Sequence, residues 1–190
     1  MTDAEVIARS GEDPSAFREI FVRYHSSVLG YARRRVGWEV GEEVAAQTFL
    51  EAFTHRSRFD MRFDSAKPWL MAIATNLIRH HLRDERTHIA ALLRVPKELP
   101  PDPVDDPAAL DAERMGPALA RALLSLSDQD RETFLLVAIA ELTYRETATA
   151  LDVPIGTIRS RISRAKTTLR EHLGQEMAIH MWEEESSDDG

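Results

Sequence analysis

The chain has 190 residues, of which 43% are hydrophobic and 29% are charged, so it can bury one medium-sized core or two small ones. It has no cysteine, which excludes disulfides and thiolate chemistry, and its net charge of −8 does not by itself indicate a nucleic-acid binder. No basic-then-apolar leader opens the sequence, and the longest apolar run, residues 134–140, is far too short to span a bilayer. We therefore expect a soluble, intracellular protein.

Apolar residues recur at spacings of three and four along most of the chain, and strand-like alternation is absent, which predicts an all-α protein. A first helix is expected to begin at Asp13-Pro14, because an N-cap residue is followed there by proline at the first helical position. This helix should end at the basic run 33–35. Two glycines then bracket a short connector, and a second helix is expected over residues 42–54.

The second predicted helix has an outer side on which a leucine is framed by acidic and amide side chains. An exposed leucine in such a setting is typical of a protein-docking surface. A plain solvated face explains the charges equally well. The residues of this side are Glu43, Gln47, Leu50 and Glu51.

A polar loop over residues 55–66 carries Phe59 and Phe63 among basic residues, and Pro68 opens a long helix to about Thr87. An asparagine and several arginines form one stripe along that helix, opposite its apolar side. Such a stripe beside aromatic side chains suits unstacked bases and their phosphates, although a solvated basic face with buried phenylalanines fits the same pattern. The stripe consists of Thr75, Asn76, Arg79, Arg83 and Arg86.

Residues 94–106 are rich in proline and acid, and we expect them to form an extended linker rather than regular structure. The predicted organisation is two small helical domains, 1–90 and 113–173, joined by an acidic proline-rich linker at 91–112. The second domain should contain a buried element at 131–141 with a Ser127 cap. Residues 174–190 hold six acidic and no basic residues, and are predicted to be an acidic tail.

Residues 143–170 are predicted to form a helix-turn-helix. A Thr143-x-x-Glu146 capping box starts the first helix, and Asp152-Val153-Pro154 ends it. The second helix runs over 155–173, with an apolar stripe on one side and small hydroxyl residues and arginines opposite. That composition suits the major groove, where arginine reads guanine or holds phosphate, although a solvated amphipathic helix has a similar pattern. The expected contacting residues are Thr157, Arg159, Ser160, Ser163, Arg164 and Lys166.

With both halves considered, the chain resembles an extracytoplasmic-function (ECF) sigma factor, the smallest class of bacterial RNA polymerase sigma subunits. The resemblance covers about residues 14–173. It rests on K-P-W-L-x-x-I-A-x-N at 67–76, which is similar to sigma region 2, and on V-P-I-G-T-I-R-S-R-I-S-R-A-K at 153–166, which is similar to region 4. The order of the two strings, separated by an acidic linker, is more specific than either alone.

The resemblance implies a non-enzymatic initiation subunit without cofactor or metal that acts in the bacterial cytoplasm. Region 2 would melt the promoter −10 element, with Asn76 holding an unstacked base, and region 4 would read the −35 element. The implied −10 residues are Phe59, Phe63, Thr75, Asn76, Arg79 and Arg83. The implied −35 residues include Arg159, Ser160, Ser163 and Arg164.

The implied partners are duplex and single-stranded promoter DNA and the clamp and flap regions of core RNA polymerase. The clamp would be gripped by the side that contains Glu43 and Gln47, and the linker would thread toward the RNA exit channel. Members of the family are often restrained by an anti-sigma factor, so that partner class is implied as well. No insertion into a membrane is implied.

Two other interpretations remain. The first is a stand-alone helix-turn-helix regulator, which would bind duplex DNA without polymerase. The second is a helical metal enzyme, based on Glu85-x-x-His88 with His80 and His81 nearby, but the second such pair needed for a di-iron site is missing. Met71 and Ser163 depart from the common family pattern, so the promoter sequence cannot be transferred. The acidic tail lies outside the resemblance and is expected to be disordered, or to fold back as a DNA mimic.

Overall fold

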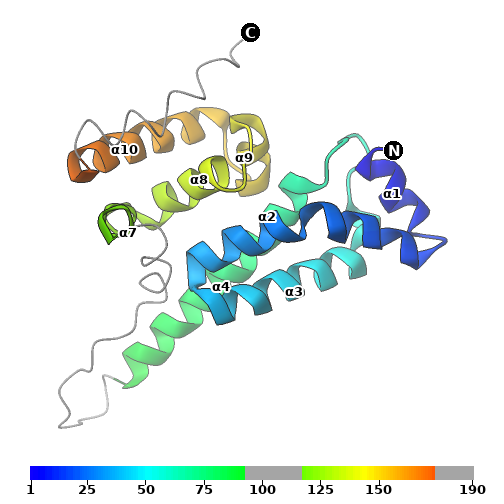
Figure 1. The fold of residues 1–190 in the computed structure, drawn as a ribbon, viewed down its shortest axis with the longest axis horizontal. Helices are drawn as coiled ribbons and strands as arrows, with labels where there is room; N and C mark the ends of the chain where they lie inside the picture. The colour runs from blue at the N-terminus through cyan, green and yellow to red at the C-terminus, as the bar shows by residue number, and fades with distance from the viewer. Residues whose placement is uncertain (93–116, 174–190) are drawn as a thin grey trace.

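The computed structural model describes residues 1–92 and 117–173, and every regular element in these ranges is a helix, which confirms the predicted fold class (Figure 1). Most of the predicted linker and the whole acidic tail lie outside the described residues. The helices of the N-terminal part are α1 (Asp3–Arg9), η1 (Pro14–Phe17), α2 (Arg18–Val36), α3 (Trp38–Thr54), η2 (Arg56–Arg58) and α4 (Lys67–Leu92). Those of the C-terminal part are α7 (Pro117–Leu124), α8 (Asp128–Ala138), α9 (Tyr144–Leu151) and α10 (Ile155–Leu173).

The N-terminal unit is a bundle of α2, α3 and α4, with α1 packed across one end (Figure 1). Helix α1 was not predicted. Its signal was present, because Thr2 and Glu5 form a reciprocal capping box in which each backbone N–H donates to the other side chain, at 2.9 and 3.3 Å. The helix buries Val6 and Ile7 against the bundle. Helical periodicity is recognised over a window of about 11–18 residues, and the seven residues of α1 are too few to show it.

The turn between α2 and α3 is shorter than predicted. Gly37, at φ 80°, makes the whole connector, and α3 begins at Trp38 instead of at residue 42. Gly41 therefore lies inside the helix, where its hydrogen allows close packing on α2. A Cβ at that position would lie 2.7 Å from the Cα of Arg33, which is closer than van der Waals contact permits.

The C-terminal unit contains the predicted helix-turn-helix, formed by α9 and α10. The capping box is present, with the Glu146 N–H donating to Thr143 Oγ1 at 3.2 Å, and Asp152 ends α9 in the left-handed conformation at φ 53°. Helix α8 follows the predicted Ser127 cap but ends at Ala138, three residues before the expected boundary. Of the predicted apolar stripe of α10, Ile158, Ile162, Ala165 and Leu169 are buried, Leu173 at its end is half-buried, and Ile155 at its start is 38% exposed.

The two units pack against each other. Helix α9 lies against α4, and α8 approaches α2, so the C-terminal unit covers one side of the N-terminal bundle (Figure 1). The buried apolar residues of the two units form one continuous cluster. Because this contact joins segments far apart in sequence, no local pattern could predict it.

Candidate nucleic-acid and polymerase interfaces

The predicted DNA-contacting side of α10 is exposed to solvent. Arg159, Ser160 and Ser163 are exposed, and the side chain of Arg164 is 58% exposed. Thr157 and Lys166, predicted as further contacts, are half-buried at the edges of this side. The structure thus places the predicted set along one face of a single helix, with its central residues the most accessible.

Arg164 does not extend freely from the helix. Its Nη2 donates to Asp130 Oδ1 at 2.7 Å and its Nε donates to Asp130 Oδ2 at 3.2 Å, which is a bidentate pair with α8. Burial acts to raise the pKa of Asp130, but hydrogen bonds from Arg164 and Ser127 outweigh it and hold the pKa below its ordinary value. The carboxylate stays ionised and fixes the direction of the guanidinium.

Arg161, a further arginine of α10, is only 9% exposed. Its Nη2 donates to Gln129 Oε1 at 2.9 Å, so it holds α10 against α8. Two consecutive residues of α8, Gln129 and Asp130, therefore set the orientation of the recognition helix. Sequence periodicity places a residue on an arc, but it does not show which arc a neighbouring helix covers.

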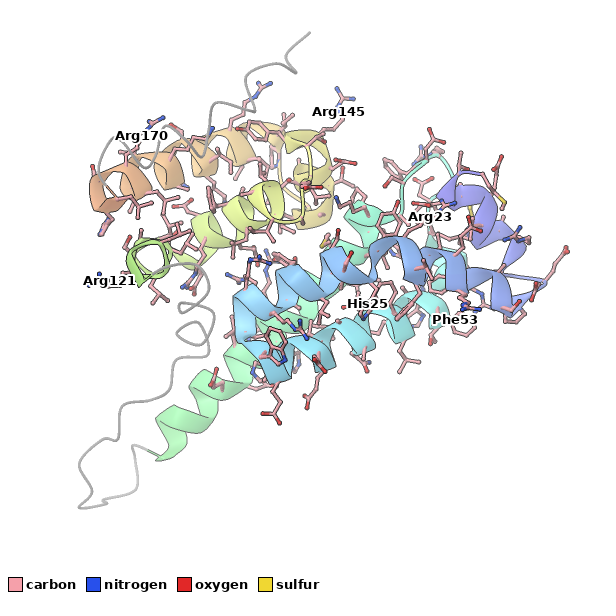
Figure 2. All side chains as sticks on the ribbon, viewed as in Figure 1. Arg23, His25, Phe53, Arg121, Arg145 and Arg170 are labelled. Atoms are coloured by element: carbon pink, nitrogen blue, oxygen red, sulfur yellow. The ribbon has the colours of Figure 1, made fainter. Side chains whose placement is uncertain are left out.

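The sequence did not single out Arg145, although it lies beside the turn of the helix-turn-helix. It lines a shallow groove together with residues of the turn, and Figure 2 shows it projecting from the outer side of the C-terminal unit, as does Arg170. Its place in the first turn of α9, between the two capping-box residues Thr143 and Glu146, was the available signal. The residues that line the groove are Arg145, Ala148, Thr149, Asp152, Val153, Pro154 and Ile155.

The residues of the stripe predicted on α4 are not all exposed. Asn76 and Arg83 are exposed, as expected. Thr75 was predicted on the same outer side, but it is 1% exposed and its hydroxyl lies 3.0 Å from that of Tyr31 on α2, so the prediction of its position was wrong. Arg86 is in the helix, but its side chain lies outside the described residues. Thr75 sits at the margin of the apolar side, where the contact with α2 decides burial.

Arg79 of the same stripe is paired with Glu132 of the C-terminal unit. Its Nε and Nη2 donate to the two carboxylate oxygens at 2.9 and 2.6 Å. The Glu132 side chain is only 3% exposed, and Arg35 Nη2 lies 3.8 Å from it. A carboxylate buried this far needs such partners, since an unpaired buried charge is strongly destabilising. Arg79 therefore joins the two units in this structure.

The two phenylalanines of the loop between α3 and α4 have different positions. Phe59 is 5% exposed and packs on Trp69 with ring centroids 5.3 Å apart, so it is part of the core. Phe63 is 48% exposed. Both rings were given as −10 residues, and of the two only Phe63 is exposed enough to stack on a base. Met61, in the same loop, is 47% exposed.

The outer side of α3 has the predicted character. Glu43 and Gln47 are exposed, Leu50 is 57% exposed, and Gln47 donates to the half-buried Glu51 at 3.3 Å. The sequence missed Trp38, which is 44% exposed at the start of α3 and lies under the guanidinium of Arg33, 3.4 Å from the ring centroid. It was missed because the helix was predicted to begin four residues later.

The described part of the chain offers no metal site. Among these residues no three His, Asp or Glu side chains come together, and His80 pairs with Asp84 at 2.9 Å. His88 of the Glu85-x-x-His88 pattern has a side chain outside the described residues. None of the described helices is both long enough and apolar enough to cross a membrane.

Comparison with known proteins defines the class to which this fold and these faces belong. Two family models match, Sigma-70 region 2 over residues 20–88 and Sigma-70 region 4 over residues 117–169. The class is therefore the sigma subunits of RNA polymerase. The chain is 30% identical over 167 residues to RNA polymerase sigma factor CarQ of Myxococcus xanthus, covering 84% of this chain and 90% of that protein. It is 26% identical over 170 residues to ECF RNA polymerase sigma factor SigW of Bacillus subtilis, covering 85% and 90%.

The chain belongs to the ECF family of RNA polymerase sigma factors, which are transcription initiation factors with a DNA-binding helix-turn-helix and not catalytic enzymes. Two solved structures share its fold. One is sigma factor RpoE in complex with the anti-sigma factor NepR from Bartonella quintana, with TM-score 0.67, 23% identity, and 84% of this chain and 98% of that chain covered. The other is CnrH in complex with the cytosolic domain of CnrY, with TM-score 0.66, 24% identity, and 90% and 96% covered.

Proposed function

We propose that this sigma factor binds core RNA polymerase, recognises the −35 and −10 elements of its promoters, and melts the promoter to start transcription in the bacterial cytoplasm. One observation carries the proposal: two separate exposed faces lie on different units. The face on α10 suits duplex DNA, and the face on α4, with the adjoining loop, suits unpaired bases. A stand-alone regulator needs only the first of these.

The −35 element is assigned to the exposed face of α10, with Arg159, Ser160, Ser163 and Arg164 as its central residues. The pairing of Arg164 with Asp130 uses two of the five N–H donors of a guanidinium, so three remain for a base edge or a phosphate. A guanidinium already held by a carboxylate loses less conformational entropy on binding than a free one. Thr157 and Lys166, at the edges of the face, are assigned to the DNA backbone.

The −10 element is assigned to Asn76, Arg79, Arg83 and Phe63. An exposed amide can hydrogen-bond the edge of an unstacked base, and an exposed phenyl ring can stack on its face. Phe59 and Thr75 are buried, so their part in this site is to support the loop and the helix. Glu132 of the C-terminal unit occupies the Nε–Nη2 edge of Arg79, so a phosphate can take both donors of that edge only when the two units separate.

The polymerase-binding face is assigned to α3, where Leu50 is exposed among Glu43, Gln47 and Glu51. The proposed organisation is region 2 over 1–90, a linker over 91–112 that threads toward the RNA exit channel and lets region 4 reach the flap, region 4 over 113–173, and an acidic tail after it. The solved sigma factors of the same fold are bound to NepR and CnrY. An anti-sigma factor is accordingly the further partner that we propose.

The test is permanganate footprinting of polymerase reconstituted with either the wild type or Asn76→Ala. With the wild-type subunit, core polymerase should open a genomic promoter and thymines near the start site should react. Asn76→Ala should leave polymerase binding unchanged and reduce thymine reactivity about tenfold, the scale of losing one base contact. Normal reactivity with Asn76→Ala refutes the role of Asn76. Duplex binding by the protein alone, with no transcription alongside polymerase, refutes the proposed function.

A further inference from the structure

A buried carboxylate near the N-terminus joins three parts of region 2. Asp3 is 2% exposed and lies at the start of α1. Its Oδ2 accepts the backbone N–H of Ala66 at 2.7 Å, and its own N–H donates to the carbonyl of Asp64 at 3.1 Å. The Tyr24 hydroxyl and the Arg23 guanidinium of α2 also donate to the carboxylate. One side chain therefore connects α1, α2 and the end of the loop that precedes α4.

The loop that Asp3 holds is the one that presents the exposed aromatic ring. Its beginning is fixed by Phe59, which packs on Trp69, and its end is fixed at Asp64 and Ala66 by Asp3. The Ser65 hydroxyl lies 3.4 Å from that of Tyr24, so three consecutive residues at the end of the loop are anchored to the same cluster. Phe63 lies between the two anchored ends and is 48% exposed.

Asp3 also acts on the start of α4. The Ala66 N–H precedes the first residue of the helix, where backbone donors lack partners within the helix and a negative charge is favoured. The carboxylate thus fixes the start of the helix that carries Asn76 and the end of the loop that carries Phe63. The loop and α4 are therefore both held at the Asp3 carboxylate.

Packing of α1 does not require this arrangement. Val6 and Ile7 bury the apolar side of the helix, and a buried carboxylate is costly unless it is fully paired. The partners of Asp3 are donors of the loop and of α2, not of its own helix. The geometry assigns to Asp3 the role of a positioning residue, which sets the distance between Phe63 and Asn76 and hence the choice of the unstacked promoter base; this role rests on the proposed function.

The role is tested by base selectivity on a premelted promoter. Polymerase is reconstituted with wild type, Asp3→Asn or Glu5→Ala, and binding is compared on templates that carry each of the four bases at every unpaired −10 position. Glu5→Ala is the matched control, because it removes the capping box of α1 without touching a contact to the loop. A wrong base weakens wild-type binding by about tenfold, and we expect Asp3→Asn to reduce that penalty to about threefold or less.

Each outcome has a defined meaning. Loss of selectivity with Asp3→Asn and wild-type selectivity with Glu5→Ala, both at unchanged polymerase affinity, supports the positioning role. Wild-type selectivity with folded Asp3→Asn, or equal losses in both variants, overturns it. Wild-type polymerase without any base preference on these templates would refute the proposed −10 recognition itself, and the positioning role with it.

A second variant covers the case in which Asp3→Asn does not fold. Tyr24→Phe removes the hydroxyl that donates to Asp3 and contacts Ser65 but keeps the ring in place. It should lower base selectivity in the same direction and by less, about twofold, because the Ala66 bond remains. Full base selectivity in a folded Tyr24→Phe, together with an unfolded Asp3→Asn, would overturn the proposal. It would show that the contacts of Asp3 with Tyr24 and the loop serve stability alone.

Discussion

Arg79 and Arg164 were both predicted to contact DNA, and in the structure each lies against a carboxylate in bidentate geometry. The two carboxylates, Asp130 and Glu132, differ in which unit they belong to. Asp130 belongs to the same unit as Arg164, so the pair can persist while the helix binds DNA. Glu132 belongs to the other unit, so its pair with Arg79 cannot persist when the units separate. At the scale of the residue, Asp130 orients the guanidinium of Arg164 within one unit, whereas Glu132 ties the guanidinium of Arg79 to the other unit.

Arg164→Lys tests whether the oriented guanidinium reads a base. Lysine keeps the charge but cannot form the planar two-point contact, so sequence discrimination at one −35 base pair should fall by about 1–3 kcal/mol while nonspecific binding changes little. The control is Arg170→Lys, at the exposed end of the same helix (Figure 2). Fluorescence anisotropy with a set of −35 duplexes measures both. A uniform loss over all duplexes would assign Arg164 to phosphate instead.

Tyr31 should make the folded state less stable at alkaline pH. It is fully buried with its hydroxyl against Thr75, and burial raises its pKa from 10.0 to about 12. The folded state therefore binds this proton more tightly than the unfolded state. The resulting stability, up to about 3 kcal/mol, is complete below pH 10 and is lost as the pH rises from 10 to about 12.

We expect the melting temperature of the wild type to fall more steeply over that range than the melting temperature of Tyr31→Phe, which has no proton to lose. Thermal melting followed by circular dichroism at several pH values measures the difference. Parallel profiles for the two proteins would contradict the assignment to Tyr31.

At the scale of the element, the sequence predicted helices best where local chemistry decides. The capping box of α9, the Ser127 cap of α8 and the bounds of α10 are confirmed, because each depends on residues within one turn. Thr75 was predicted to be exposed but is buried, and Ile155 was predicted to be buried but is exposed. Both predictions failed because the exposure of each residue depends on what a distant element covers. The predicted start of α3 was wrong because Gly41, which allows close packing on α2, was assigned to a turn.

Gly41→Ala should destabilise the α2–α3 pair. The added methyl would overlap backbone atoms of Arg33, which cannot move away without shifting a helix, so we expect a loss of about 1–3 kcal/mol in the free energy of unfolding. Gly156→Ala is the matched control, because a Cβ there meets nothing within 4 Å and alanine favours the helix by up to about 1 kcal/mol. Urea unfolding measures both. Equal stability of the two variants would contradict the close approach of α2 and α3.

At the scale of the whole molecule, the contact between the units covers part of the face that we propose for −10 recognition. Arg79 and Arg35 both pair with Glu132, and Lys67 Nζ lies 3.8 Å from Glu141 Oε2, so three ion pairs between described residues cross the boundary. The sequence predicted two helical units but not this contact, since neither the pairing of Arg79 nor the burial of Glu132 has a local signature.

Glu132→Gln should weaken the contact between the units. Arg79 and Arg35 would lose their shared carboxylate, and the free protein should bind a single-stranded −10 oligonucleotide about three- to tenfold more tightly. Asp128→Asn is the control, since it removes the same charge from the same helix at a surface pair with Arg131. Equal gains in both variants would mean that net charge alone is responsible. No gain in either would mean that the contact does not limit DNA binding.

The Arg79–Glu132 pair also has a thermodynamic consequence. If Arg79 holds the −10 strand as proposed, DNA and Glu132 compete for the same edge of its guanidinium. The apparent dissociation constant for the strand then equals the intrinsic one divided by the fraction of molecules whose units are apart. A contact worth about 1.4 kcal/mol makes that fraction about one tenth. A polymerase that binds only separated units removes this tenfold penalty, and by reciprocity the promoter tightens the hold of the subunit on polymerase by the same factor. A single buried carboxylate thereby makes the two binding events cooperative without any contact between their sites.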